Sequence, residues 1–182
     1  ITAISFDYAA FDDQQNLVAL DGFGHAETVD EVWEASKGFV AYSQAMVVAD
    51  KDGRILFTPF QGTPCRENLP LDASGWGEGA DPTMLLDGTM YGGWTVPVGE
   101  DGKVVFDDPE NCVVAYEDYP HGFDPAQGYL LSGNNDWGGL TFDNDVTNDG
   151  AYVGGPWSDG IRADTIDQWL AASTTAGTAT LE

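Results

Sequence analysis

The sequence has 182 residues, of which 42% are hydrophobic and 12% aromatic, enough to fill one packed domain and too many for a disordered chain. Its 31 acidic and 6 basic side chains give a net charge of -25, which disfavours binding to nucleic acid or to anionic membranes. No stretch approaches the roughly 20 apolar residues that cross a bilayer. The charge remains open to three interpretations: plain solubility, adaptation to high salt, or divalent-cation binding by clustered aspartates.

The amino-terminal part is expected to contain a strand followed by a helix. Residues 1–11 alternate apolar and polar positions, as in a half-buried strand. Residues 17–20 are either a short strand or the approach to a helix. Thr28 and Glu31 have the spacing of a capping box, which predicts a helix start, and Gly38 is placed to end that helix.

A β-hairpin is the clearest local prediction in the chain. The apolar run 45–49 is followed by a turn that ends in Gly53, where a positive φ is tolerated, and the returning strand is expected over 54–60. Residues 67–93 are rich in Gly, Pro and Asp and predict a long surface excursion.

The carboxyl-terminal half is expected to alternate short strands and loops before a last helix. A second hairpin is predicted from strands 94–98 and 103–106, which flank a Gly-rich turn. Further short strands are predicted at 112–116 and 128–131. Ile, Trp and Leu at helical spacing predict the helix over 162–172.

Together these elements predict an α+β fold with a mostly antiparallel sheet. Trp33 and Trp169 lie on the apolar faces of the two helices and are expected in the core, whereas Trp137 and Trp157 lie in Gly-rich loops and are candidates for lining a binding pocket. We divide the chain into four consecutive parts: 1–66 with strand, helix and hairpin, the loop-rich 67–127, 128–172 with a strand, an Asn/Asp/Gly loop and a helix, and the tail 173–182.

The two cysteines, Cys65 and Cys112, are compatible with one disulfide in an oxidising compartment or with two separate buried thiols. Zinc binding is not expected, because there is no CxxC motif and the two histidines are far apart in sequence. Asp145 and Asp149 fit the first half of a calcium-loop pattern, but the acidic residue that should close it falls at Pro156. These two aspartates are the candidate cation ligands.

Several segments, in order along the chain, resemble the β-chain of penicillin acylases and acyl-homoserine-lactone acylases. The segment 43–57 (SQAMVVADKDGRILF) is similar to the family's QN..YAD.DG.I.Y hairpin, and 62–66 (GTPCR) to the G..P.R that follows it. The helix expected at 28–39 is similar to A.(S/T)W.EF..A. Residues 123–135 are similar to NP..GY...ANN, and 161–166 (IRADTI) to the helix R..RI..LL.

The resemblance implies a layered αββα fold of N-terminal-nucleophile (Ntn) hydrolases, of which this chain would be an interior part of the β-chain. It implies hydrolysis of a linear amide C–N bond by a Ser, Thr or Cys that autoproteolysis exposes, with the residue's own α-amine as general base. Ile1 has no nucleophilic atom, so the nucleophile is expected outside this chain, which alone should be inactive. No cofactor is required, and the family allows a structural calcium ion.

The resemblance also implies roles for particular residues. Ala45 takes the place of an Asn that donates to the oxyanion, and a register shifted by one residue would make Gln44 that donor. Arg66 matches an Arg that orders the active site, and its alternative is a surface ion pair. Asn134 and Asn135 either frame the active site or form an Asx turn.

The expected partners are a small amide substrate and the rest of the precursor, meaning the α-chain and other β-chain parts. The expected location is periplasmic or secreted. Two alternatives remain: a non-catalytic secreted module that binds a ligand or calcium, and a degenerate acylase that keeps the fold without the chemistry.

Overall fold

The computed structural model describes residues 3–5, 16–41, 44–66, 69–72, 75–82, 84–137, 153–154 and 157–178. It confirms an α+β fold with a small, open, antiparallel sheet. Of the strand predicted at 1–11, only residues 3–5 are described, and they form no strand. None of the described helices is both long and apolar enough to cross a membrane.

Two short helices form one layer. Helix α1 (Asn16–His25) resolves the open interpretation of residues 17–20 in favour of a helix, and α2 (Val29–Ala35) follows it. The predicted capping box is present, since the Glu31 backbone N–H donates to Thr28 Oγ1 at 3.2 Å and the Glu31 carboxylate accepts from the Thr28 backbone N–H at 3.1 Å. The 3₁₀ helix η2 (Ser36–Gly38) completes this layer.

The predicted hairpin forms strands β1 (Met46–Ala49) and β2 (Ile55–Thr58), which pair antiparallel with Val47 opposite Phe57. Gly53 in the turn has a φ of 82°, as the turn requires. Strand β5 (Gly122–Phe123) adds to the other edge of β2, so the strand order is β1-β2-β5. A second, two-stranded sheet joins β3 (Leu71–Asp72) to β4 (Gly75–Trp76) within the predicted surface excursion.

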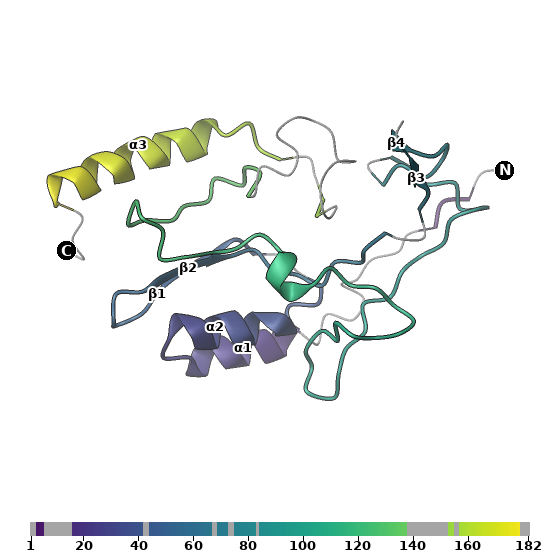
Figure 1. Cartoon of the computed structure of the whole chain (residues 1–182), viewed down its shortest axis with the longest axis horizontal. Helices are drawn as coiled ribbons and strands as arrows, with labels where there is room; N and C mark the ends of the chain where they lie inside the picture. The colour runs from purple at the N-terminus through teal and green to yellow at the C-terminus, as the bar shows by residue number, and fades with distance from the viewer. Residues whose placement is uncertain are drawn as a thin grey trace.

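The two faces of β2 point into different layers. Leu56 is fully buried against Val29 and Val32 of α2, whereas Phe57 faces the opposite side. On that side lies α3 (Ile161–Ala176), and the segment leading to residue 137 runs between α3 and the sheet (Figure 1). The helix pair and α3 therefore lie on opposite sides of the hairpin.

Aromatic side chains form the centre of the main core. Tyr116, at the start of the 3₁₀ helix η3 (Tyr116–Asp118), stacks on Trp33 with ring centroids 3.8 Å apart. Its hydroxyl lies 2.8 Å from Ser36 Oγ and donates to the Trp33 carbonyl. Burial raises the pKa of Tyr116, so the phenol stays neutral and serves as a hydrogen-bonding group inside the core. Trp33 is therefore a core residue, as predicted.

Three strand predictions are wrong or only partly right. Residues 128–131 form no strand, because the backbone leaves a turn at Gly128, with a φ of 78°, and then runs beside α3. The second hairpin keeps its turn but is reduced to the Val98–Val104 bridge, which is flanked by the hydrogen bonds from Gly99 to Lys103 and from Val105 to Pro97. The strand predicted at 112–116 is a single bridge from Val113 to Pro64.

The last helix is longer than predicted, and its tryptophan is misassigned. It extends from Ile161 to Ala176 rather than over 162–172. Trp169 is 71% exposed, so it is not a core residue. The helix has few apolar contacts with the rest of the described chain, because Ala163, near its amino-terminal end, is its one buried residue there.

Candidate functional site

A cleft of about 490 Å³ lies between the outer face of the sheet and α3. The sheet contributes Phe57 and Gly122, and the segment after β5 contributes Leu130 and Leu131. Its volume is in the range of small-molecule sites in proteins. The remaining lining residues are His121, Gln127, Asn135, Trp137, Ala163, Asp164 and Asp167.

The loop 132–137 closes one end of the cleft and is tightly joined to α3. A Cβ on Gly133 would lie 2.7 Å from the backbone nitrogen of Ala163, so only glycine allows this approach. Arg162 Nη2 donates to the Gly133 carbonyl at 2.8 Å and to Asn134 Oδ1. These contacts fix the first turn of α3 against the loop.

The two asparagines of this loop have different environments. Asn134 is exposed, has a φ of 61° and accepts from Arg162, so it lies at the junction with α3 rather than in the cleft wall. Asn135 lines the cleft, and its Oδ1 accepts from the Gly133 backbone N–H at 3.0 Å. In an Asx turn the Asn oxygen accepts from an N–H two residues later, whereas this bond comes from a residue two positions earlier, so it does not form the Asx turn of the second alternative.

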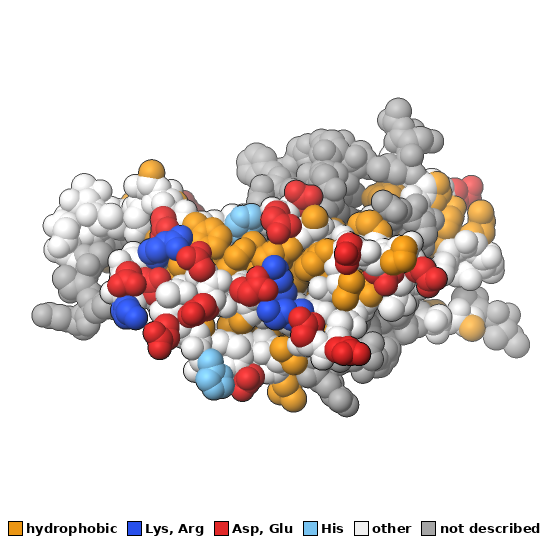
Figure 2. Space-filling model, turned by 60° about the horizontal axis from the view of Figure 1, so that its bottom comes forward, with side chains coloured by type: hydrophobic (Ala, Val, Ile, Leu, Met, Phe, Trp, Pro, Cys, Tyr) orange, Lys and Arg blue, Asp and Glu red, His pale blue; other side chains and the backbone are white. Residues whose placement is uncertain are grey.

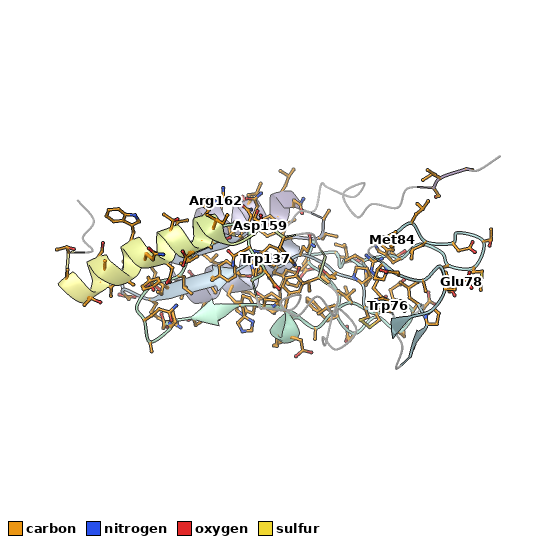
Figure 3. The ribbon with its side chains drawn as sticks, turned by 90° about the horizontal axis from the view of Figure 1, so that it is seen from above. Trp76, Glu78, Met84, Trp137, Asp159 and Arg162 are labelled. Atoms are coloured by element: carbon orange, nitrogen blue, oxygen red, sulfur yellow. A yellow bond between two sulfur atoms is a disulfide. The ribbon has the colours of Figure 1, made fainter. Side chains whose placement is uncertain are left out.

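Both tryptophans predicted to line a pocket lie together. The rings of Trp137 and Trp157 meet edge to face with centroids 4.4 Å apart. Trp137 lines the cleft, and both indole nitrogens are buried with no hydrogen-bond partner in the described parts of the chain. Figure 3 shows Trp137 beside Asp159 and Arg162, at the amino-terminal end of α3.

The far rim of the cleft is acidic. Tyr129 donates to Asp167 at 2.7 Å, and the nearby carboxylate raises the pKa of the phenol. Asp164 accepts from Gln168 one turn further along α3. No Lys or Arg is among the residues that line the cleft in the described structure.

The remaining predicted site residues lie elsewhere. Gln44 is exposed and Ala45 half-buried just before β1, and neither lines the cleft. The guanidinium of Arg66 stacks on Trp94, 4.0 Å from the ring centroid. Arg66 itself has a φ of 60°, directly after Cys65. The cleft and the Arg66 region are therefore separate features.

The cysteines and histidines have defined structural contacts. Cys65 and Cys112 form a disulfide with a Cα–Cα distance of 5.4 Å, as the first of the two alternatives predicted. His25 Nδ1 lies 2.8 Å from the Asp21 carbonyl oxygen, and His121 Nδ1 lies 2.7 Å from that of Tyr119. The predicted cation ligands Asp145 and Asp149 lie outside the described residues. Within the described ranges, no group of three acidic, His or Cys side chains is placed to hold a metal ion.

Sequence reasoning missed most of the cleft lining, including Phe57, His121, Asp164 and Asp167. Only Phe57 had a usable signal, because the alternation along β2 requires Leu56 and Phe57 to face opposite sides. The others come from segments more than 60 residues further along the chain, and no local pattern brings them to β2.

Comparison with known proteins assigns the chain to a family. The family model described as penicillin amidase matches residues 2–182, nearly the entire chain. A search of curated proteins finds no match. The match defines the class as acylase-like amide hydrolases, which cleave a C–N bond. This chain belongs to the penicillin amidase family, as its sequence motifs predicted.

Proposed function

We propose that this chain is an interior part of the β-chain of an Ntn amide hydrolase and that the nucleophile lies outside it. The observation that carries the proposal is the family match over residues 2–182. In this mechanism an amino-terminal hydroxyl or thiol attacks the amide carbonyl while its own α-amine accepts the proton. The products are a carboxylic acid and an amine.

The contacts of the described nucleophile candidates support an external nucleophile. Both sulfurs are joined in the Cys65–Cys112 disulfide, so neither is a thiolate. In both His25 and His121, the ring nitrogen Nδ1 lies against a backbone carbonyl oxygen. A Ser-His-Asp triad also needs the other ring nitrogen, Nε2, to face a serine hydroxyl, and the contacts of the described residues join neither ring to a serine.

This chain would contribute the framework around the reacting centre. The hairpin β1–β2 supports the segment with Gln44 and Ala45, where the family places its oxyanion donor. Ala45 has no side-chain donor, so we assign that role to the exposed amide of Gln44. Arg66, stacked on Trp94, and the loop with Asn134 would order the surrounding structure.

The cleft beside Asn135, Trp137 and Trp157 would receive part of the amide substrate, because its walls combine aromatic and aliphatic side chains with a few polar groups. The partner of the chain would be the rest of its precursor, in a layered αββα arrangement. The disulfide suits a periplasmic or secreted location. The chemistry requires no cofactor, and a structural calcium ion would be held by Asp145 and Asp149.

The test is to produce the longer polypeptide that contains this chain and to assay a chromogenic phenylacetyl or fatty-acyl anilide. We expect autoproteolysis and turnover from the longer protein and none from the 182-residue chain. Turnover by the 182-residue chain, or by a longer protein whose new amino-terminal residue is neither Ser, Thr nor Cys, would contradict the proposal.

A second measurement tests Gln44. Loss of one oxyanion donor costs about 100- to 1000-fold in kcat, so Gln44→Ala should produce that loss in the processed protein. Asn111→Ala is the matched control, because this amide is not among the residues that line the cleft and its described hydrogen bonds go to Asp108. A processed protein that binds substrate but does not turn it over would instead support the degenerate acylase, the alternative that Ala45 favours.

A further inference from the structure

The loop 77–91 exposes a group of large apolar side chains at one end of the molecule. Met84, Leu85 and Met90 are 71%, 70% and 68% exposed, although such side chains are usually buried. Figure 3 shows Met84 near Glu78 and Trp76, far from the α3 end of the molecule. Three such residues within seven positions form an apolar patch rather than isolated surface residues.

Hydrogen bonds join the described residues of the loop, which are all of 77–91 except Thr83. Asp87 donates its backbone N–H to the Gly79 carbonyl at 2.9 Å, which joins the two sides of the loop. The Asp87 carboxylate accepts from the backbone and hydroxyl of Thr89, and Met90 N–H donates to the Asp87 carbonyl. These bonds present Met84 and Met90 outward instead of letting them collapse onto the core.

The charge around the loop decides what can cover it. Residues 67–102 contain seven acidic residues and no Lys, Arg or His. A second copy of this chain would bring the same negative charge against it, and an anionic lipid surface would also be repelled. The complementary partner is a protein surface with an apolar centre and a rim of Lys and Arg.

We propose that the loop 77–91 is a docking surface for such a basic-rimmed apolar surface on the remainder of the chain's own precursor. Met84, Leu85 and Met90 form the apolar centre, and Glu78 forms part of the acidic rim. The assignment of the partner surface to the rest of the precursor rests on the function proposed above.

Methionine oxidation tests this in the processed, full-length protein. Hydrogen peroxide converts an exposed Met to its sulfoxide, and peptide mass spectrometry gives a rate for each site. Met84 and Met90 should oxidise about tenfold more slowly than in the same protein unfolded in urea, because docking covers them. In the 182-residue chain alone they should approach the unfolded rate, while the half-buried Met46 of β1 stays slower and reports that the chain is folded.

A charge reversal separates docking from general packing. Glu78→Lys in the full-length protein should raise the oxidation rates of Met84 and Met90 toward the unfolded values. Glu110→Lys makes the same change in net charge on an exposed residue outside the acidic segment and should leave both rates unchanged.

Two results would overturn the docking proposal: Met84 and Met90 oxidising at the unfolded rate in a processed and active protein, or protection that grows with protein concentration, which would indicate a second copy. The anilide assay keeps the two proposals apart. Protection of Met84 and Met90 in a protein that is never processed and never turns over substrate would contradict the proposed function and retain the docking surface.

Discussion

Removal of the Cys65–Cys112 disulfide should strongly destabilise this chain. The bond joins two segments that otherwise meet through few backbone contacts: the Pro64–Val113 bridge, Cys65 N–H to the Cys112 carbonyl at 3.1 Å, and Val114 N–H to the Thr63 carbonyl at 2.8 Å. The perturbation is the double change Cys65→Ser and Cys112→Ser, which removes the bond without leaving a free thiol.

The expected magnitude follows from the loop that the disulfide closes. The two cysteines are 47 residues apart in sequence. In the chain-entropy treatment, closing a loop of that length lowers the entropy of the unfolded state by about 14 cal/mol/K, or about 4 kcal/mol at 25 °C. Typical domains are stable by only about 5–15 kcal/mol, so the loss would remove a large part of the total.

Urea unfolding of the oxidised chain, the reduced chain and the double variant measures this effect. The reduced chain and the variant should agree and should both be less stable than the oxidised chain by about 4 kcal/mol. A reducing agent should not change the variant, which serves as the control. A difference below about 1 kcal/mol would refute the entropic reasoning, and two titratable thiols in the unreduced, denatured protein would refute the disulfide itself.

Three further predictions concern single side chains. Gly133→Ala should cost about 1–3 kcal/mol of unfolding free energy in urea, because the new methyl group would overlap Ala163; Gly24→Ala, with open space around it, is the control and should be neutral or slightly stabilising. Thr28→Ala should cost about 1 kcal/mol by the same measurement, because it removes the capping box; an unchanged midpoint would show that α2 depends on packing alone. Backbone and guanidinium donors lower the pKa of Asp124, so its contribution is present above the unfolded pKa and is lost as pH falls through the lowered folded pKa. The destabilisation by Asp124→Asn, measured as unfolding free energy, should therefore be largest at pH 7 and decrease progressively as the pH falls below the unfolded pKa of Asp, and a difference that stays constant with pH would contradict the electrostatic account.

Local signals were sufficient to predict the helix and hairpin near the amino terminus. The capping box at Thr28 and the turn at Gly53 each satisfy backbone groups within four or five residues, so their sequence patterns determine their structures. The penicillin amidase motifs, taken together, predicted the family of the chain, which no single local pattern could establish.

The remaining elements and the cleft depend on contacts between segments that are distant in sequence. Strand β5 exists because Gly122 pairs with Phe57, 65 positions earlier, and residues 122–123 have no strand signal of their own. The second predicted hairpin is reduced to the Val98–Val104 bridge, and Val104 also bonds to Lys37, which lies in a distant segment of the chain. The cleft depends on such contacts entirely, since Phe57 and Asp167 meet only after β5 and α3 have taken their places.

The few basic side chains lie where separate segments meet. Arg54 joins Asp30 of α2 to Asp124 after β5, and Lys103 reaches Glu34 of α2. Arg162 ties α3 to the loop beside the cleft, and Arg66 stacks on Trp94. Each exposed pair contributes only about 0–1 kcal/mol, so these contacts do more to set the relative positions of segments than to raise stability. The surplus of acidic side chains is left on the surface, including the face shown in Figure 2, where it repels a second copy and favours a basic partner.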